Sequence, residues 1–228
     1  MANHGIRSLD NQRSLVDDVY DRIRSAIVTG ELRPGQQIRQ VPIAESIGVS
    51  QRTAREALMR LVSEGLALHE PRKGFRVASF PFGELEQIYR MRSLLEGWAM
   101  ELAAERISAD ELEEMRRLLP STVTTEPPGS VAEPHQANRQ FHMIPIKASG
   151  AKHLVRVLSQ LWQLVFTHYG GEEDPQSMAE VALRELQEHE RILDALQRAD
   201  GRAARSAIEE HIETTIRGLE QDWKSRAA

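Results

Sequence analysis

The sequence has no cysteine among its 228 residues. A disulfide framework, a thiolate metal site and a cysteine nucleophile are therefore all excluded. The N-terminal stretch MANHGIRSLDNQRSLV lacks the apolar core of a signal peptide, and no run approaches the ~20 apolar residues that span a bilayer. We therefore expect a soluble, cytoplasmic protein with no membrane partner.

The net charge of −5 is distributed unevenly along the chain. Residues 1–78 carry 12 Lys and Arg against 9 Asp and Glu, whereas the remaining 150 residues carry 17 against 25. A slightly basic head on an acidic body favours an anionic partner for the head only.

Apolar periodicity and turn residues predict a mainly α-helical chain. The N-terminal part is expected to contain three helices, at residues 14–29, 41–46 and 50–63, followed by two short extended segments, LALHE and FRVAS. Six further helices are expected at residues 84–106, 109–119, 131–149, 151–168, 176–198 and 201–224. This order predicts a domain at residues 1–78, a linker at residues 79–85 and an all-helical antiparallel bundle at residues 86–228.

The stretch GVSQRTAREALMR, residues 48–60, concentrates hydrogen-bonding side chains at the start of a helix. Ser50 is a natural N-cap and could also contact a phosphate. Gln51, Arg52 and Arg55 project from the first turn and a half, where a helix-turn-helix protein contacts base edges. Gln suits adenine, and Arg suits guanine or a phosphate. Taken alone, such a helix is more often a solvated helix end that happens to be basic.

The hairpin after this helix strengthens the DNA-binding interpretation. Its tip carries Arg72, Lys73 and Gly74, a small basic turn that can approach a narrow minor groove or a pair of phosphates. Helix, turn, helix and hairpin in this order predict a winged helix-turn-helix.

The segments LRPGQQI, IAESIGVSQRTAREALMRLVSEGLA and PRKGFRVA resemble the N-terminal domain of GntR-type bacterial transcription regulators, over about residues 12–78. In that family the recognition helix commonly opens with Ser/Thr-Arg-Thr, and a second Arg follows four residues after the first. Here Gln51 stands where the first Arg is usual, with Arg52 beside it, while Thr53 and Arg55 are kept. The presence of Gln51 affects which base is preferred at one operator position, but it does not change the expected binding mode.

The remaining chain resembles the all-helical FCD-type ligand-binding domain of the FadR subfamily, over roughly residues 80–220. The segments that carry the resemblance are IYRMRSLLEGWAMELAAERI, NRQFHMIPIKASGAKHL, EHERILDALQRAD and IEEHI. Six helices rather than seven favour the smaller, VanR-like version. The resemblance implies a homodimer on a two-fold-related operator, and repression relieved by a small organic acid is the family's usual logic. Activation is the alternative.

Four side chains in the helical part form a candidate metal site. Asn138 and His142 are four residues apart and share one helix face, while His189 and His211 lie on the last two helices. If these helices pack as antiparallel neighbours, three imidazoles and an amide oxygen suit zinc, nickel or a similar divalent ion. A carboxylate could fill the open positions. Resembling domains more commonly have Asp at the Asn138 position, and an amide oxygen is a weaker ligand.

Other residues in this part carry less specific signals. Any single His on such a helix is more often a packed or surface residue, and His168 is at most pocket-lining. Arg92 matches a position where resembling domains often carry Arg, and it could anchor an effector carboxylate. An ion pair with Glu96, four residues later, is the alternative.

Two other functions compete with a ligand-responsive regulator. A metal-dependent helical enzyme would need an acid or base beside the metal, but Glu188 and Glu190 point about 100° to either side of His189 on a helix. No Ser-His-Asp order, glycine-rich phosphate loop or HExxH motif is present, so we expect no enzyme. An architectural DNA-binding protein without an effector would show no effect of ligands on operator affinity.

Overall fold

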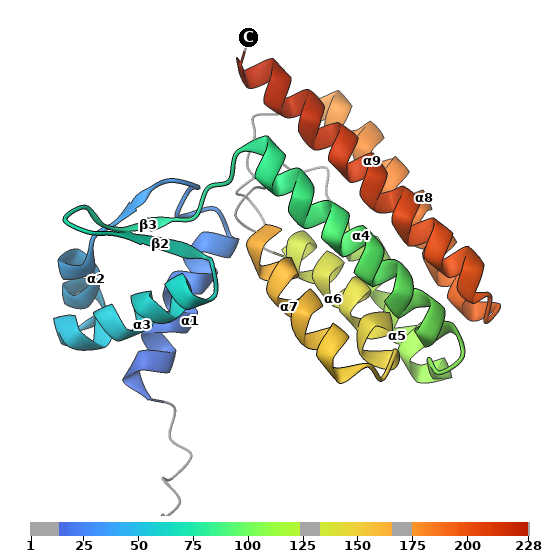
Figure 1. Cartoon of the computed structure of the whole chain (residues 1–228), viewed down its shortest axis with the longest axis horizontal. Helices are drawn as coiled ribbons and strands as arrows, with labels where there is room; N and C mark the ends of the chain where they lie inside the picture. The colour runs from blue at the N-terminus through green and yellow to red at the C-terminus, as the bar shows by residue number, and fades with distance from the viewer. Residues whose placement is uncertain (1–13, 124–132, 166–174, 228) are drawn as a thin grey trace, which may run out of the picture.

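The computed structural model describes residues 14–123, 133–165 and 175–227. A small head of helices and strands lies beside a larger body of helices, and a short connection after β3 joins the two (Figure 1). The expected mainly α-helical architecture, a winged helix-turn-helix followed by an antiparallel helical bundle, is confirmed.

From residue 14 onward, the head contains three helices and a three-stranded antiparallel sheet in the order β1-β3-β2. The elements are α1 (Leu15–Val28), β1 (Gln37–Ile38), α2 (Gln40–Ile47), α3 (Gln51–Ser63), β2 (Ala67–Glu70) and β3 (Gly74–Val77). The sequence did not predict β1, which lies in the stretch expected to be a turn. Two residues are too short to show an alternating pattern, and β1 exists because Gln37 and Ile38 pair with Arg76 and Phe75.

Local capping fixes where the head helices begin and end. The Ser14 side chain accepts a hydrogen bond from the Asp17 N–H in a capping box at the start of α1. Ser50 caps α3 without a capping box, and its side chain accepts from the Thr53 N–H at 3.1 Å. Gly48 ends α2 with φ of 76°, a conformation that suits glycine. The turn between α2 and α3 is therefore encoded locally.

One hydrophobic cluster holds the head together. Val19, Ile23 and Ile27 on one face of α1 pack with Leu58 and Leu61 of α3, and the inward-facing side chains of the sheet complete the cluster. Burial of these apolar side chains orients α3 so that its opposite face is left to solvent.

The described residues of the body form six helices, all close to their expected positions. They are α4 (Phe82–Ala104), α5 (Ala109–Leu118), α6 (Glu133–Ala148), α7 (Lys152–Val165), α8 (Pro175–Gln197) and α9 (Gly201–Ala227). A 3-10 turn, η1 (Leu119–Ser121), follows α5. Because α4 begins at Phe82, its first turn lies inside the stretch expected to be the linker.

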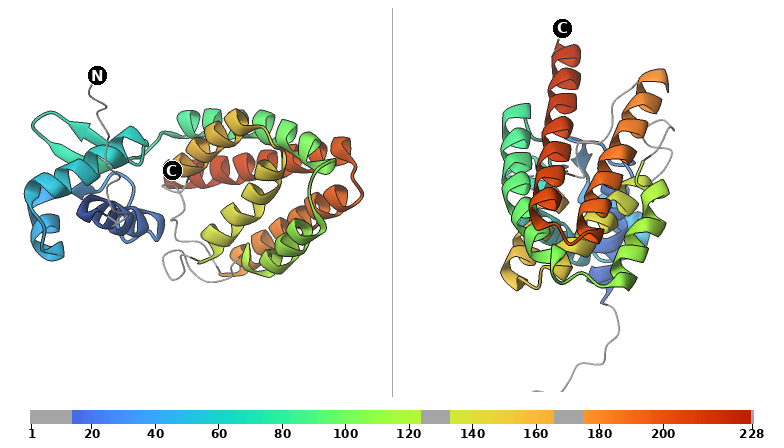
Figure 2. Two further views of the ribbon diagram at one scale, coloured as in Figure 1. Left: turned by 90° about the horizontal axis from the view of Figure 1, so that it is seen from below. Right: turned by 90° about the vertical axis from the view of Figure 1, so that its right-hand side faces the viewer.

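Within the body, α8 and α9 form a helical hairpin, and α4 runs alongside α9 (Figure 2). Glycine permits the close α4–α9 approach at Gly201, where an added Cβ would lie 3.1 Å from the Glu101 carbonyl oxygen. Close packing of these two helices places α9 side chains next to those of α4 and α8.

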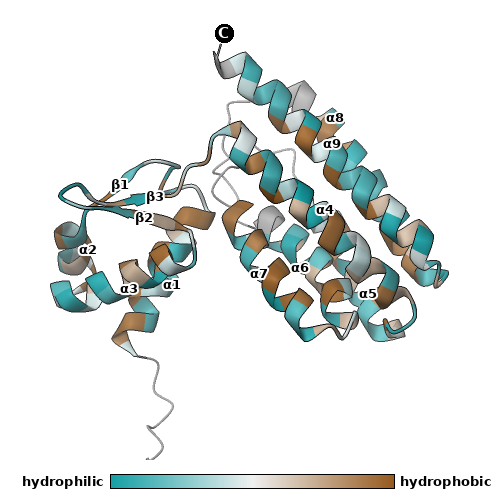
Figure 3. Ribbon diagram, in the orientation of Figure 1, coloured by the Kyte–Doolittle hydropathy of each residue, from teal (hydrophilic) through white to brown (hydrophobic). Residues whose placement is uncertain are grey.

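Hydrophobic and hydrophilic residues alternate along the helices (Figure 3). The apolar faces of the body helices meet in a single core cluster, to which every helix from α4 to α9 contributes. Among the described residues, no helix has both the length and the apolar character needed to cross a membrane.

Candidate functional site

Three histidines from three helices converge inside the body. His142 of α6, His189 of α8 and His211 of α9 are all buried, and one ring nitrogen of each lies within 4.8 Å of the others. The Nε2 atoms of His142 and His189 are 3.2 Å apart. Packing of α6, α8 and α9 therefore brings together the three histidines that the sequence singled out.

Each of these histidines has an oxygen atom next to its Nδ1 atom, which leaves its Nε2 atom available for a ligand. The Nδ1–oxygen distances are 3.4 Å for His142 and Glu96 Oε2, 3.0 Å for His189 and Thr122 Oγ1, and 2.8 Å for His211 and Glu188 Oε2. The longest of the three is an electrostatic contact rather than a well-formed hydrogen bond. An outer carboxylate or hydroxyl on each ring is the arrangement that orients metal-binding histidines.

Burial keeps two of the imidazoles neutral. It lowers the pKa of His142 to about 4, against the opposing effect of Glu96. It also lowers the pKa of His189 well below the usual value, and the nearby His211 and His142 act in the same direction. Near neutral pH these two rings therefore present lone pairs, the form that binds a divalent metal.

The predicted fourth ligand, Asn138, lies on the same helix as His142. Its Oδ1 atom is buried and has no hydrogen-bond partner. Asn138 and His211 both line a small cavity of about 10 Å³, together with Arg92 and Trp162. A buried oxygen without a partner is costly in a folded protein, so the Asn138 side chain fits a role as a ligand.

Arg92 forms the ion pair that the sequence offered as the alternative to effector binding, and it also lines the small cavity beside Asn138 and His211. It is buried on α4, and its Nε donates a 2.7 Å hydrogen bond to Glu96 Oε1 in the expected i, i+4 ion pair. Its guanidinium carbon is also 3.6 Å from the ring centroid of Trp162. Burial raises the pKa of Glu96, but Arg92 and then His142 more than offset this and lower that pKa to about 2.

The helix expected to read DNA presents its first turns to solvent. Gln51, Arg52 and Arg55 are all exposed at the N-terminal end of α3, and Thr53 is partly exposed beside the capping Ser50. The Nε2 of Gln40 on α2 donates to the Gln51 carbonyl oxygen at 2.9 Å, which ties the two helices at the turn. Arg52 pairs with Glu56 on the helix surface at 3.0 Å.

The hairpin tip is held in an unusual backbone conformation. Arg72 has φ of 70° and Gly74 has φ of 85°, and a non-glycine residue with positive φ is uncommon. Lys73 forms an ion pair with Glu70 at 3.1 Å, and its carbonyl oxygen accepts a 3.0 Å hydrogen bond from Gln37. These contacts leave the Arg72 side chain exposed at the tip.

The residues around the histidines were not predicted from the sequence. Thr122 follows η1 with no motif to mark it, and Glu188 was considered only as a neighbour of His189, whereas it contacts His211 across the α8–α9 hairpin. Glu96 was expected only as the partner of Arg92. The His168 prediction lies outside the described residues.

Comparison with protein families divides the chain into two matched parts. A model described as FCD domain matches residues 87–214, and one described as bacterial regulatory proteins, gntR family, matches residues 15–77. The first corresponds to the histidine-containing body and the second to the head.

Relatives align over most of the chain. The HTH-type transcriptional regulator McbR of Escherichia coli (strain K12) is 28% identical over 213 residues, 92% of this chain and 95% of McbR. The probable D-xylose utilization operon transcriptional repressor of Paenarthrobacter nicotinovorans is 28% identical over 200 residues, 87% and 86% of the two chains.

A solved structure of E. coli McbR/YncC superposes with a TM-score of 0.79 at 26% identity, covering 93% of this chain and all 100% of that one. The putative transcriptional regulator GntR from Rhodococcus sp. RHA1 shares the fold, with a TM-score of 0.70 at 21% identity over 92% of this chain and 99% of that one.

Proposed function

This chain belongs to the GntR family of bacterial regulatory proteins, with an FCD domain after its helix-turn-helix head. We propose that it is a repressor that binds operator DNA as a homodimer. We further propose that a small organic acid, bound at a metal centre, controls this binding. The family and the relatives named above are transcription regulators and not enzymes. The single observation that carries the sensing part is the buried cluster of His142, His189 and His211.

We assign operator binding to α3 and the hairpin tip. Gln51, Arg52 and Arg55 on α3 are the side chains that would contact base edges or phosphates in a major groove. Ser50 and Thr53 at the helix start, and Arg72, Lys73 and Gly74 at the tip, would contact the backbone. Their exposure on one small, otherwise well-packed head supports this assignment.

We assign the metal centre to His142, His189 and His211, with the Asn138 oxygen as the fourth protein ligand. Neutral imidazoles with one oxygen suit zinc, nickel or a similar divalent ion, and Glu96, Thr122 and Glu188 would orient the rings. When bound, the ion supplies open coordination positions for an acid, so the acid and the metal would be sensed together.

The effector is a small carboxylate that enters beside Arg92. The cavity there, about 10 Å³, has room for about one water molecule, so an acid has to displace side chains as it binds. Arg92 is already paired with Glu96, and that carboxylate also lies beside His142. Binding of an acid at Arg92 would therefore disturb the Glu96–His142 contact and change the packing between α4 and α6, which is how a ligand favours one of two conformations.

The dimer interface that we propose lies on the outer face of α4. Met91, Leu94 and Trp98 are 45%, 65% and 50% exposed and follow one another at helical spacing, with Leu102 one further turn along the same line. A contiguous apolar stripe on a surface helix is typical of a protein interface. A two-fold axis at α4 would pair the two heads for two operator half-sites.

The metal assignment is tested by the metal content of untagged protein purified without chelator. We expect about one divalent ion per chain, and loss of that ion in the double variant His142→Ala/His189→Ala. The variant His153→Ala changes an exposed histidine on α7 and serves as the control. Wild-type protein that takes up neither zinc nor nickel would refute the metal centre.

The operator assignment is tested with gel shifts at low salt. Arg55→Ala should weaken operator binding by about fivefold or more, because a good contact from Arg to guanine contributes roughly 1–3 kcal/mol. Arg156→Ala, an exposed arginine on α7, should bind as the wild type does. Equal operator affinity of Arg55→Ala and wild type would refute the role of α3. Titration with candidate acids distinguishes a sensor from an architectural protein.

A further inference from the structure

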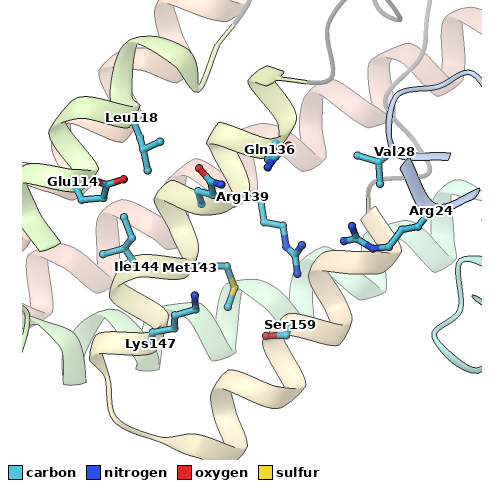
Figure 4. Close-up of a pocket in the computed structure, with 11 residues that line it drawn as sticks. Arg24, Val28, Glu114, Leu118, Gln136, Arg139, Met143, Ile144, Lys147 and Ser159 are labelled. Carbon is cyan, nitrogen blue, oxygen red and sulfur yellow. The ribbon is translucent and has the colours of Figure 1, made fainter. Parts of the chain in front are cut away.

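A second cavity lies between the head and the body, away from the histidine cluster. Its volume is about 570 Å³, within the range of small-molecule sites. It is lined by residues of α1, α5, α6 and α7, and we call it the head–body groove (Figure 4). The groove therefore borders both the helix that supports α3 and the helix that carries His142.

The polar residues of the groove are mainly basic. Arg24 of α1 and Arg139 of α6 point into the same space, and Lys147 lies further along α6 (Figure 4). Glu114 also lines the groove, but its carboxylate is 2.5 Å from Arg117 on its own helix. The positive charge of the groove thus comes from both sides of the boundary between head and body.

Arg24 and Arg139 are held near one another although their charges repel. Both side chains are only partly exposed. Burial lowers the pKa of Arg139, and the charge of Arg24 lowers it further. An anion between two guanidinium groups would relieve this repulsion and accept charge-assisted hydrogen bonds from both.

The other residues that line the groove favour a ligand with an apolar portion next to its anionic group. Val28, Met143 and Ile144 contribute apolar surface, while Gln136 and Gln140 add neutral hydrogen-bonding groups. This combination fits an organic anion better than an inorganic one, because the apolar part of such a ligand would be removed from water.

The groove and the metal centre share helix α6. Its groove side carries Gln136, Arg139 and Met143, and its other side carries Asn138 and His142. On the opposite wall, α1 is fixed to the recognition helix by the Arg60–Asp17 ion pair at 2.8 Å and by packing of their apolar faces. A ligand that holds α1 against α6 would therefore link the position of α3 to that of His142.

We propose that the head–body groove binds a small organic anion, a carboxylate or a phosphate ester with an apolar tail, through Arg24 and Arg139, and that its occupancy fixes the head on the body. This site is separate from the metal centre. The binding step is independent of the proposed function, whereas the effect on DNA rests on it.

Binding is tested by calorimetry on the full chain with hexanoate, hexyl phosphate and the neutral hexanamide. We expect one site per chain for at least one of the two anions, and the tighter of them identifies the anionic group. Hexanamide should bind at least tenfold more weakly. The variant Arg24→Gln/Arg139→Gln should lose at least tenfold in affinity, and Arg22→Gln/Arg156→Gln, which removes two exposed charges from α1 and α7, should match the wild type.

Two further variants separate the groove from the metal centre and from loss of folding. His142→Ala/His189→Ala should bind the anion as the wild type does, and Ile144→Trp should block binding by filling the groove. Equal binding by Arg24→Gln/Arg139→Gln and wild type, binding of neither anion, or loss of binding in the histidine variant would overturn the site.

The coupling is tested by measuring operator affinity with and without the anion that binds. We expect a change of at least threefold in wild type and in the histidine variant, and none in Arg24→Gln/Arg139→Gln. If a saturating concentration of the anion left the operator affinity of wild type unchanged, the coupling would be refuted, but the anion-binding site would not. If the protein proved to bind no metal, neither the anion-binding result nor the operator-affinity result would be affected.

Discussion

Asn138 is the residue at which the proposed metal centre differs most from the pattern expected of a strong site. Its amide oxygen is buried without a hydrogen-bond partner, so its position is suited to a ligand, yet it carries no charge. An Asp side chain has nearly the same shape as Asn, so substitution by Asp would add a negative charge with little steric change. Affinity for the ion should then depend directly on this one atom.

We expect Asn138→Asp to bind zinc on the order of tenfold more tightly than wild type, because a charged carboxylate is a stronger ligand than an amide oxygen. A tenfold change in affinity corresponds to roughly 1.4 kcal/mol. Asn138→Ala should bind more weakly than wild type, because the oxygen is removed. Competition against a fluorescent chelator measures all three affinities. If the three proteins bound zinc equally, Asn138 would not be a ligand.

The buried histidines also predict how stability depends on pH. Because the pKa of His142 is about 4 in the folded protein and about 6.5 when unfolded, the unfolded chain binds more protons between these values. Stability of the metal-free protein should therefore be full above pH 6.5 and fall as the pH is lowered towards 4. The loss is up to about 1.4 kcal/mol per pH unit for each proton taken up.

Denaturant unfolding of EDTA-treated protein at pH 7, 6 and 5 measures this loss. His142→Leu removes one titrating group and should show a smaller decrease than wild type, whereas the exposed His153→Leu should show the same decrease. A pH dependence identical in His142→Leu and wild type would mean that protonation of His142 does not limit stability.

At the scale of elements, the first turn of α3 has two expected roles, to cap the helix and to contact a DNA phosphate. Ser50 caps the helix, and the same hydroxyl is placed where a DNA phosphate is expected. The two roles respond differently to substitution, because Asp is as good an N-cap as Ser but repels a phosphate.

We expect Ser50→Ala to lower the free energy of unfolding by about 1 kcal/mol through loss of the cap. Ser50→Asp should keep the stability of the wild type but bind the operator more weakly than Ser50→Ala does. Urea unfolding and gel shifts, carried out on the same preparations, measure the two properties. Wild-type operator affinity in Ser50→Asp would show that no phosphate lies next to this residue.

At the scale of the whole molecule, the exposed stripe on α4 predicts the oligomeric state. Leu94→Glu/Trp98→Glu places two carboxylates in the proposed interface and should convert a dimer into monomers with unchanged helical content. Leu183→Glu, at an exposed leucine of α8, should remain dimeric. Light scattering after size-exclusion chromatography measures the mass. A dimer that persists in the double variant would place the interface elsewhere.

The sequence alone predicted the elements well because their signals are local. Ser50 and Gly48 mark the start of α3 and the turn before it, and every expected body helix is present within a few residues. The strand β1 was missed because it depends on pairing with β3, a contact between residues distant in the sequence. Residue types and spacing also singled out Asn138, His142, His189 and His211 as candidates.

Tertiary structure alone decided what surrounds those candidates. Glu96, Thr122 and Glu188 come from three different segments. They reach the histidine rings only because α4 packs on α6, the residue after η1 packs on α8, and α8 packs on α9. The head–body groove likewise exists only because α1 faces α6. The sequence by itself determined the helices and, through its motifs, the family, because capping residues, apolar periodicity and motifs are local to each segment. It also marked candidate residues for binding DNA or a metal, and these stay predictions. Packing decided which atoms meet across segments, because burial and long-range contacts have no local signature.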